Sequence, residues 1–600
     1  MRDVLLSLLA VLTTVTGGSC YGAAGEVDTT FGVNGIVLVS LPSPWVSSAV
    51  VRRSGGRIVY VGTVMKPANL GGLHDCVSGL LAGFNADGSA DPSFGRGGVV
   101  ASGEILAKPV DMLAGRCLRT AIVQRDDKVV VFGTGRDTTT GTDTSFALRL
   151  TARGDVDPTF GASGYSPIET GDEWPWAAAL QNDGKTIVTL VASQPRLTLL
   201  RLNADGSRDT SFGSNGRAVV PLAGSFGLAG QPTAVALQRD GKIVVAASWV
   251  EASMGSLIEA IRLARLLPDG SLDPSFGVGG IAGGDLREQY VGVPSLAIQA
   301  DGRIVVATSL GTRETFGLAR YRADGSLDTT FGTGGLVTTA FPGYDQAAVT
   351  DLEITPSGKL VVAGYAARPS NAEGVVARYL GDGSLDAAFG AARDGRAAVR
   401  GSLGFQSMSL SSDGSLVFAS LVNGLMRLDK LKGDDALDVV EFYNASLDHY
   451  FMSADVQEVT DLDFGFHRGW TRTGLGFKAY STNLGNAAVA RILIPPALGD
   501  SHFFTSDEEE LAEILAKMVS DPNYQGYIVE SPIVFRVVRP GASTGQCPPA
   551  TEPVYRLWNQ RLDSNHRYTA SLAVRAEMIS RGYVSEGAGS SGVAMCAPLG

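Results

Sequence analysis

The phrase Asp-x-x-Phe-Gly-x-x-Gly, in places degenerate, recurs through the first two thirds of the chain at intervals of 52 to 66 residues. Repetition on this scale restricts the possible folds, because each copy can bury its apolar face only against a neighbouring copy. A copy is longer than one hairpin and suits a four-stranded blade with variable loops. The sequence therefore predicts a mainly β fold that begins with a seven-bladed β-propeller. The phenylalanines of the phrase are Phe31, Phe94, Phe160, Phe212, Phe276, Phe331 and Phe389.

Two Asp-Gly turns divide a copy into strands. In the clearest copy, apolar runs at 233–238 and 243–247 flank Asp240-Gly241, and a third run at 261–267 leads to Asp269-Gly270. Asp-Gly between apolar runs favours a hairpin, because glycine adopts the positive φ of a tight turn.

The two ends of the array are complementary parts of one copy. The chain enters at the phrase that holds Phe31 and leaves after an apolar run at 425–428. We expect a strand at 35–41 to complete the last blade and close the ring, which would hide the edge strands. An open β-solenoid is the alternative, although its period would be shorter and more regular.

Residues 318–332, LARYRADGSLDTTFG, resemble the delta-60 repeat of exported bacterial proteins. The resemblance covers about two thirds of the chain. It implies a propeller-like scaffold and carries no general set of catalytic residues.

Charged residues recur within the copies and allow two interpretations. They form either a ring of ligands around a channel or an Arg–carboxylate pair or turn cap in each blade, and we favour the second. A calcium site is disfavoured, because the turns lack the dense oxygen ligands of an EF-hand loop. The arginines are Arg149, Arg201, Arg265, Arg320, Arg378 and Arg427, with Gly83 in the first copy; the aspartates are Asp28, Asp91, Asp157, Asp209, Asp273, Asp328 and Asp386.

We assign the propeller to 25–430. Beyond it the repeated phrase ends and a different sequence pattern begins. A polar linker at 431–437 leads to 438–600, where three related phrases carry His449, His502 and His566. Each phrase precedes a helix-like stretch, one of which begins at a capping box with Ser506 as the N-cap. The helices lead to strands that begin near Trp470, Tyr527 and Tyr583. We therefore predict a smaller α+β domain of three pseudo-repeats.

The three histidines have three possible roles. They could converge on a metal, since neutral imidazole is a good ligand. They could bind the backbone of their own unit, which we favour, so that no metal is expected. They could also line ligand pockets in which Trp470, Tyr527 or Tyr583 stacks on a sugar.

Residues 439–598 resemble a C-terminal repeat domain of unknown function that is found on exported bacterial proteins, including some secreted hydrolases. The resemblance implies an accessory role. The middle unit departs from the pattern because it lacks a Tyr-x-x-Asn phrase.

Residues 1–24 have the pattern of an export signal: Arg2, an apolar run at 4–15 and small residues up to Ala24. The run is too short to span a bilayer as a permanent helix. A lipid anchor at Cys20 is a weaker alternative. We expect a secreted, periplasmic or cell-surface protein.

The remaining four cysteines suit disulfides in an exported chain. Cys547 and Cys596 are the better pair, Cys76 and Cys117 are a second candidate, and buried free thiols are the alternative.

A net charge of -12 makes nucleic acid an unlikely partner. No nucleophile elbow, P-loop, HExxH or Rossmann signature is present, so no cofactor is expected. The leading hypothesis is an exported binding or scaffold protein for a glycan or protein ligand. The alternative is a propeller-type glycoside hydrolase or lyase with acidic residues in the central channel, which a channel of small or apolar residues would oppose.

Overall fold

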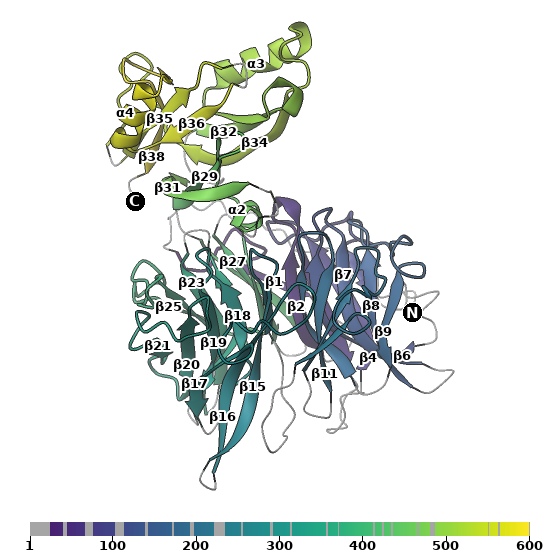
Figure 1. The fold of residues 1–600 in the computed structure, drawn as a ribbon. Coiled ribbons are helices and arrows are strands. Elements are labelled where there is room, and N and C mark those ends of the chain that lie inside the picture. Colours follow the sequence, from purple (N-terminus) through teal and green to yellow (C-terminus); the bar gives the residue numbers. More distant parts are fainter. Residues whose placement is uncertain are drawn as a thin grey trace.

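The computed structural model of the chain stacks a smaller module on one end of a large β-structure (Figure 1). In the part of the chain that the structure describes, none of the helices has the length and apolar character needed to cross a membrane. The expected export signal and Cys20 lie outside the described residues. The structure describes residues 24–598 except 40–44, 66–75, 102–112, 138–141, 171–172, 193–196, 221–233, 254–255, 289–291, 312–314, 356–357, 370, 412–413, 423–424, 434–435, 464, 466, 468, 481–486, 550 and 562–563.

Seven four-stranded antiparallel sheets precede the module in the described chain, and we number them as blades 1 to 7. This confirms a mainly β fold that begins with propeller-type sheets. Blades 1 to 3 are β2–β5 (Trp45–Arg52, Ile58–Met65, Cys76–Phe84, Val99–Ala101), β6–β9 (Leu113–Val123, Val129–Asp137, Asp143–Leu150, Tyr165–Thr170) and β10–β13 (Glu173–Leu180, Thr186–Ala192, Leu197–Leu202, Arg217–Val220). Blades 4 to 6 are β14–β17 (Ala234–Leu237, Ile243–Ser253, Ser256–Leu266, Ile281–Glu288), β18–β21 (Ser295–Ile298, Ile304–Leu310, Thr315–Tyr321, Leu336–Thr339) and β22–β25 (Gln346–Ile354, Leu360–Arg368, Asn371–Tyr379, Arg396–Val399). Blade 7 joins β26–β28 (Ser407–Leu410, Leu416–Val422, Leu425–Leu431) to β1 (Ile36–Val39).

Blade 7 is completed by the N-terminal strand. β1 runs antiparallel to β28, with Ile36 opposite Asp429 and Val39 opposite Met426. The pairing expected at 35–41 is therefore present. Val50 N of blade 1 donates to Ser407 Oγ of blade 7 at 3.1 Å, so the first and last blades are in contact.

Backbone hydrogen bonds join each blade to the next. The Gly that follows the Phe of the phrase donates to a carbonyl in the next blade, as Gly161 N does to Asp205 O at 2.6 Å. Gly161 has φ +53, and an added Cβ would lie 2.2 Å from Tyr165 O, so glycine is required there. The bond from Gly390 N to Ala24 O places the first described residue in the ring. The other bonds of this kind join Gly32 to Asp87, Gly95 to Arg153, Gly213 to Asp269, Gly277 to Asp324 and Gly332 to Asp382.

In blades 2 to 6 the recurring arginine and aspartate form an ion pair, and in blades 2 to 5 the arginine also donates to a carbonyl of the next blade. Arg320 Nε donates to Asp328 Oδ2 at 2.8 Å, and Nη1 donates to the carbonyl of Gly381 in blade 6. The guanidinium lies 4.7 Å from the centre of the Phe331 ring. The structural interpretation of the repeated charges is therefore supported. The ion pair and the ring contact recur at Arg149, Arg201, Arg265 and Arg378.

In blade 2 a lysine that follows the first turn, at Asp126-Asp127, also supports the aspartate of the repeat. Lys128 Nζ lies 3.3 Å from Asp157 Oδ2. Burial alone would raise the pKa of Asp157, but hydrogen bonds from Thr159 and the charges of Arg149 and Lys128 lower it to about 2. The repeat therefore specifies a carboxylate that is ionised in the folded state.

These aspartates should make stability depend on pH in acid. The folded-state pKa values of Asp157 and Asp273, about 2, lie below the usual aspartate value of 3.8. Their contribution is therefore fully present above about pH 4 and is lost as the pH falls from 4 to 2. We expect the melting temperature, followed by circular dichroism, to fall in that window, and to fall less steeply in Asp157→Asn. A melting temperature that stays constant down to pH 2 would contradict this.

Blade 7 departs from the arginine pattern. Lys430 holds the equivalent position, since its amide donates to Gly35 O as that of Arg320 does to Gly335 O. Lys430 Nζ lies 3.2 Å from Asp28 Oδ2. The assignment of Arg427 to the repeat was wrong, because that arginine pairs instead with Asp429 at 2.6 Å.

Blade 1, in which Gly83 replaces the arginine, takes an arginine from another strand connection. Arg53, directly after β2, has Nη1 3.8 Å from Asp91 Oδ2 and its guanidinium 5.5 Å from the Phe94 ring centre. Its Nη2 donates to the carbonyl of Ala152 in blade 2. A guanidinium is thus supplied to the same place from a different backbone position.

Both Asp-Gly turns of a blade lie at the same end of the sheet, because strand direction alternates; we call this end the turn face. β28 ends at the turn face, and the chain continues into the C-terminal module, which begins with β29 (Ala436–Asn444). Figure 1 shows the module stacked on this end of the propeller, with α2 and β31 nearest to it.

The module contains three units, each a hairpin, a helix and a returning strand. A large apolar cluster shared by the units includes Phe442, Phe504 and Val554, and smaller clusters lie within the second and third units. The first unit is completed by β30 (His449–Ser453), α2 (Val456–Asp463) and β31 (Trp470–Tyr480). The other two are β32 (Ala487–Ile494), β33 (Ser501–Thr505), α3 (Glu508–Ser520) and β34 (Ile528–Val537), then β35 (Thr551–Trp558), β36 (His566–Thr569), α4 (Leu572–Ser580), β37 (Val584–Glu586) and β38 (Val593–Pro598).

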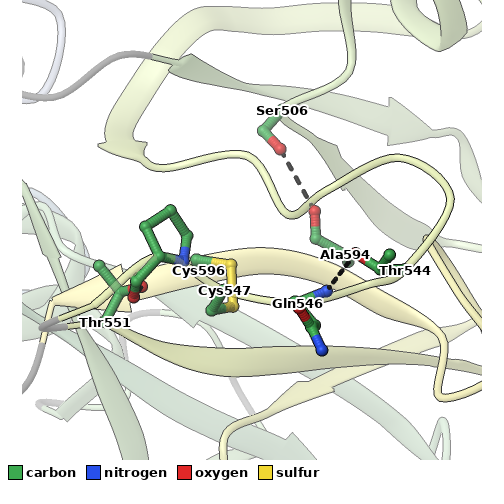
Figure 2. The surroundings of a disulfide bond; sticks show 8 residues. Ser506, Thr544, Gln546, Cys547, Thr551, Ala594 and Cys596 are labelled. Atoms are coloured by element: carbon green, nitrogen blue, oxygen red, sulfur yellow. Dashed lines mark hydrogen bonds between the residues drawn. A yellow bond between two sulfur atoms is a disulfide. The ribbon is translucent and has the colours of Figure 1, made fainter.

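Helix α3 begins one residue later than the predicted capping box. Asp507 is the N-cap, and its side chain accepts from the amides of Glu509 and Glu510. Ser506 instead donates to Ala594 O at 3.4 Å (Figure 2). A carboxylate stabilises the positive end of a helix more than a hydroxyl does, which explains the shift.

The predicted Cys547–Cys596 disulfide is present, with the two Cα atoms 5.5 Å apart (Figure 2). It attaches the segment before β35 to β38. Cys117 is also disulfide-bonded. The side chain of Cys76 lies outside the described part of the chain, so its pairing with Cys117 stays a prediction.

Removal of the Cys547–Cys596 bond should destabilise the module. The bond closes a separation of 49 residues, and the loop-closure entropy of the unfolded chain then corresponds to about 4 kcal/mol. We expect Cys547→Ala/Cys596→Ala to lower the melting temperature of the module in calorimetry. Under reducing conditions the variant and the wild type should melt alike; equal stability of the oxidised wild type and the variant would contradict the estimate.

Candidate functional site

The first strands of the blades surround a central channel that holds a cavity of about 2000 Å³. Its wall is formed mainly by alanine, valine, leucine, isoleucine, serine and threonine. The cavity extends to the C-terminal module, where Met452, Asp455, Glu458 and Arg491 border it. The channel wall is made by residues 49–53, 120–124, 176–180, 234–238, 295–299, 350–355 and 406–411.

Strand β22 contributes two carboxyl groups to this wall. Asp351 accepts from the amides of Leu352 and Met408, each at 2.9 Å, and thereby attaches blade 6 to blade 7. Burial raises the pKa of Asp351. Burial, followed by the charge of Asp351, raises the pKa of Glu353 to about 8 despite the opposing charge of Arg52. Glu353 is therefore mainly protonated at neutral pH and can both donate and accept a hydrogen bond.

The two carboxyl groups lie on the same side of the channel. Residues two apart on one strand have Cα atoms roughly 6.6 Å apart and point to the same face. A glycosidase places its two carboxyl groups on either side of the scissile bond. Asp351 is also occupied by two backbone amides. The arrangement suits ligand binding better than paired acid catalysis.

The C-terminal module lies over the turn-face end of the cavity. Arg239 of blade 4 donates to the carbonyl of Trp470, the first residue of β31. Near this contact Arg472 pairs with Asp463 at 2.5 Å, so the border of the cavity holds matched charges.

The three histidines occupy related positions at the starts of β30, β33 and β36. His449 Nδ1 lies 2.9 Å from Asp500 O of the second unit. His502 Nε2 lies 3.2 Å from Glu530, and His566 Nε2 lies 3.1 Å from Glu586. The favoured prediction, that each histidine binds the backbone of its own unit, was wrong: His449 contacts the backbone of another unit, and His502 and His566 contact carboxylates.

An arginine connects each of these carboxylates to the helix of the preceding unit. Arg491 contacts Glu530 at 2.8 Å and Glu458 of α2 at 2.7 Å. Arg556 contacts Glu586 at 3.1 Å and Glu510 of α3 at 2.8 Å. The second and third histidines thus belong to ionic networks that join the units.

The three units also meet through aromatic side chains, one from each unit. Phe504 lies 6.1 Å from Phe451 and 5.6 Å from Tyr568, ring centre to ring centre. Tyr568 donates its hydroxyl to Phe504 O at 2.7 Å. Among the described residues no group of three or more His, Cys, Asp or Glu side chains is arranged to hold a metal ion.

The three candidate stacking residues differ in exposure. Tyr583 is buried against Tyr450 and Met578. Trp470 and Tyr527 are partly buried. Ligand binding by the predicted set His449, Trp470, His502, Tyr527, His566 and Tyr583 stays a prediction.

Sequence reasoning did not single out Glu353, Arg52 or Arg53. The repeat pattern has no fixed residue at these positions, so period alone cannot find them. These residues could have been found in the sequence by another signal: each is a charged residue within, or directly after, the otherwise apolar first strand of a blade.

Two family models match parts of the chain. The model described as a "Domain of unknown function (DUF5122) beta-propeller" matches residues 181–212, 238–276, 299–331 and 355–389. The model described as a "Domain of unknown function (DUF5648)" matches residues 427–529 and 532–595. The chain is thus similar to a propeller family in four of its repeats and to an uncharacterised family in its module.

Solved structures match the chain at low similarity. The polysaccharide lyase Uly1 matches with 12% identity and a TM-score of 0.38, over 70% of this chain and 94% of that one. The β-propeller domain of the Trilobed protease from Pyrococcus furiosus matches with 12% identity and a TM-score of 0.34, over 65% and 94%. An α-L-arabinanase from Penicillium chrysogenum matches with 12% identity and a TM-score of 0.35, over 57% and 92%. None of the curated proteins compared with the chain is detectably similar to it.

Proposed function

We propose that this chain is an exported binding protein that holds a glycan in the propeller channel, with the C-terminal module as an accessory unit over the turn-face end. The single observation that carries the proposal is the cavity of about 2000 Å³ in the channel. It is larger than the roughly 300–1,000 Å³ of typical small-molecule sites, which suits a ligand of several sugar rings.

The chemistry of the wall supports a polyhydroxylated ligand. Hydroxyl and amide groups line the channel, the protonated carboxyl of Glu353 can donate and accept, and the indole of Trp176 offers an aromatic face. The disulfide between Cys547 and Cys596 fits an oxidising compartment.

The test is a glycan array with the full chain, followed by calorimetric titration of the best ligand. Trp176→Ala should weaken binding by about tenfold or more, since an aromatic contact of 1–2 kcal/mol is lost. The exposed Leu38→Ser on β1 is the control and should bind as the wild type does. If no glycan binds, or if Trp176→Ala binds normally, the channel is not the glycan site.

Catalysis by a hydrolase or lyase is the second candidate. The mainly small and apolar residues of the channel wall oppose it, whereas the raised pKa of Glu353 favours it. A carboxyl with a pKa of about 8 can act as a general acid at neutral pH. An enzyme would release new reducing ends from a bound polysaccharide, and Glu353→Gln would abolish that release while leaving binding intact. Binding without turnover would remove this candidate.

A further inference from the structure

Four consecutive blades place a glutamine directly after their first strand, beside the turn face. In each of them the backbone N–H of the glutamine donates to the carbonyl four residues later, across the first turn, at 2.7 to 2.8 Å. Blades 1 and 7 make the same backbone bond from Arg53 and Ser411, so the turn does not require a glutamine side chain. The glutamines of blades 2 to 5 are Gln124, Gln181, Gln238 and Gln299.

The side-chain oxygens of these glutamines are turned into the propeller wall. Gln124 Oε1 accepts from Arg149 Nη1 at 3.3 Å. The Oε1 atoms of Gln238 and Gln299 are buried and accept no hydrogen bond from the part of the chain that the structure describes.

The side-chain nitrogens of Gln238 and Gln299 are accessible from the cavity. Both residues line the cavity and are partly buried. Their Nε2 atoms, unlike their Oε1 atoms, are not buried, and they form no hydrogen bond to any described residue. Because the oxygen is inaccessible, each amide can only donate. The turn-face end of the channel therefore presents two donor groups from the adjacent blades 4 and 5.

The wall directly inside these two amides is apolar. Residues 234–237, Ala-Val-Ala-Leu, precede Gln238, and Ala297 and Ile298 precede Gln299. All of them line the cavity. A methyl group of a ligand can be buried there beside the two donors.

The charged residues that flank the amides on the turn side already have partners. Arg239, next to Gln238, donates to the carbonyl of Trp470. Asp301, two residues after Gln299, pairs with Arg303. A neutral acceptor therefore suits the two amides better than an ion does, because the flanking charges are balanced.

We propose that Gln238 and Gln299 donate to acetamido oxygens of an N-acetylated sugar, so that the glycan in the channel is a neutral one with N-acetylhexosamine units. This rests on the proposed function. A side chain that can only donate matches an oxygen that can only accept, as a carbonyl oxygen does, whereas a sugar hydroxyl also brings a proton that needs an acceptor. The methyl group of the acetamido substituent would lie against the apolar wall.

The test compares chitotetraose with cellotetraose by calorimetric titration of the full chain. The two differ only at C2 of each ring, which bears an acetamido group in the first and a hydroxyl in the second. Chitotetraose should bind about tenfold more tightly, since two further hydrogen bonds are made. Gln238→Met/Gln299→Met should remove that preference and leave the affinity for cellotetraose unchanged.

Gln181→Met is the matched control. Gln181 has the same position in blade 3 and the same backbone bond, but it is not among the described residues that line the cavity. Its substitution should change neither affinity. Equal binding of the two tetrasaccharides, or a preference that persists in the double variant, overturns the inference while the glycan proposal stands. Tighter binding of a tetragalacturonate than of chitotetraose would also overturn it, and the absence of any glycan ligand on the array defeats both proposals.

Thermal stability gives a second readout that does not depend on the chosen sugar. Gln238→Met/Gln299→Met should melt at the wild-type temperature or above it, because each substitution removes a buried oxygen that accepts no hydrogen bond. A lower melting temperature would show that the two glutamines stabilise their blades, and it would overturn the inference.

Discussion

A chain that begins at Trp45 is expected to lose the closed ring and to aggregate. Without β1 and the phrase before it, β28 becomes an edge strand with unpaired backbone groups. The fully buried ring of Phe31 is lost, and for a single phenylalanine such a loss corresponds to about 3–5 kcal/mol. Lys430 also loses Asp28.

Thermal unfolding and size-exclusion chromatography would measure this effect. We expect a lower melting temperature and a concentration-dependent increase in apparent mass. Leu38→Ser serves as the matched control, because that side chain of β1 is 55% exposed and its backbone pairing is unchanged. A monomeric truncated chain with the melting temperature of the full chain would show that closure by β1 contributes little.

The second large effect is expected from Arg53, and a second substitution should reverse it. Arg53→Gln leaves Asp91 buried without its cation, and the loss of one partner of a buried pair costs about 3–5 kcal/mol. Adding Gly83→Arg should recover most of that energy. The double variant then has glutamine and arginine where blade 2 has Gln124 and Arg149.

The recovery requires a small movement of Phe94. A Cβ on Gly83 would lie 2.7 Å from that side chain, so the ring must shift. In blade 2 the arginine already stands 4.8 Å from its ring centre, compared with 5.5 Å for Arg53 in blade 1. Chemical unfolding of the wild type, both single variants and the double variant measures the coupling. A double variant no more stable than Arg53→Gln would refute the equivalence of the two positions.

Local sequence was sufficient to predict the strands, the helices and the turns between them. The Asp-Gly pairs marked hairpins because only a few residues tolerate their backbone angles, and Gly241 and Gly270 indeed have φ +81 and +90. The helix after the second histidine was predicted from apolar spacing, while its N-cap was placed one residue early. The repeated Arg, Asp and Phe were interpreted as blade-building residues, and their contacts agree.

Most of the candidate site could not be predicted from local sequence. Glu353 and Arg52 come from blades 6 and 1, and the pKa of Glu353 depends on burial and on Asp351. Nothing near residue 353 in the sequence reports that burial. The bulge between Val349 and Asp351 is likewise visible only when the register of β22 against β23 is known.

The sequence by itself determined that one unit recurs, where its turns lie and that its two ends complement each other, because these properties depend on residues close in the chain. Only the tertiary structure decided that Arg53 takes the place of the arginine missing from blade 1 and that the three units meet through Phe451, Phe504 and Tyr568. The physical reason is that an ion pair or a ring contact requires only that the side-chain ends meet. The same contact can be made from different backbone positions, and a sequence pattern records positions rather than contacts.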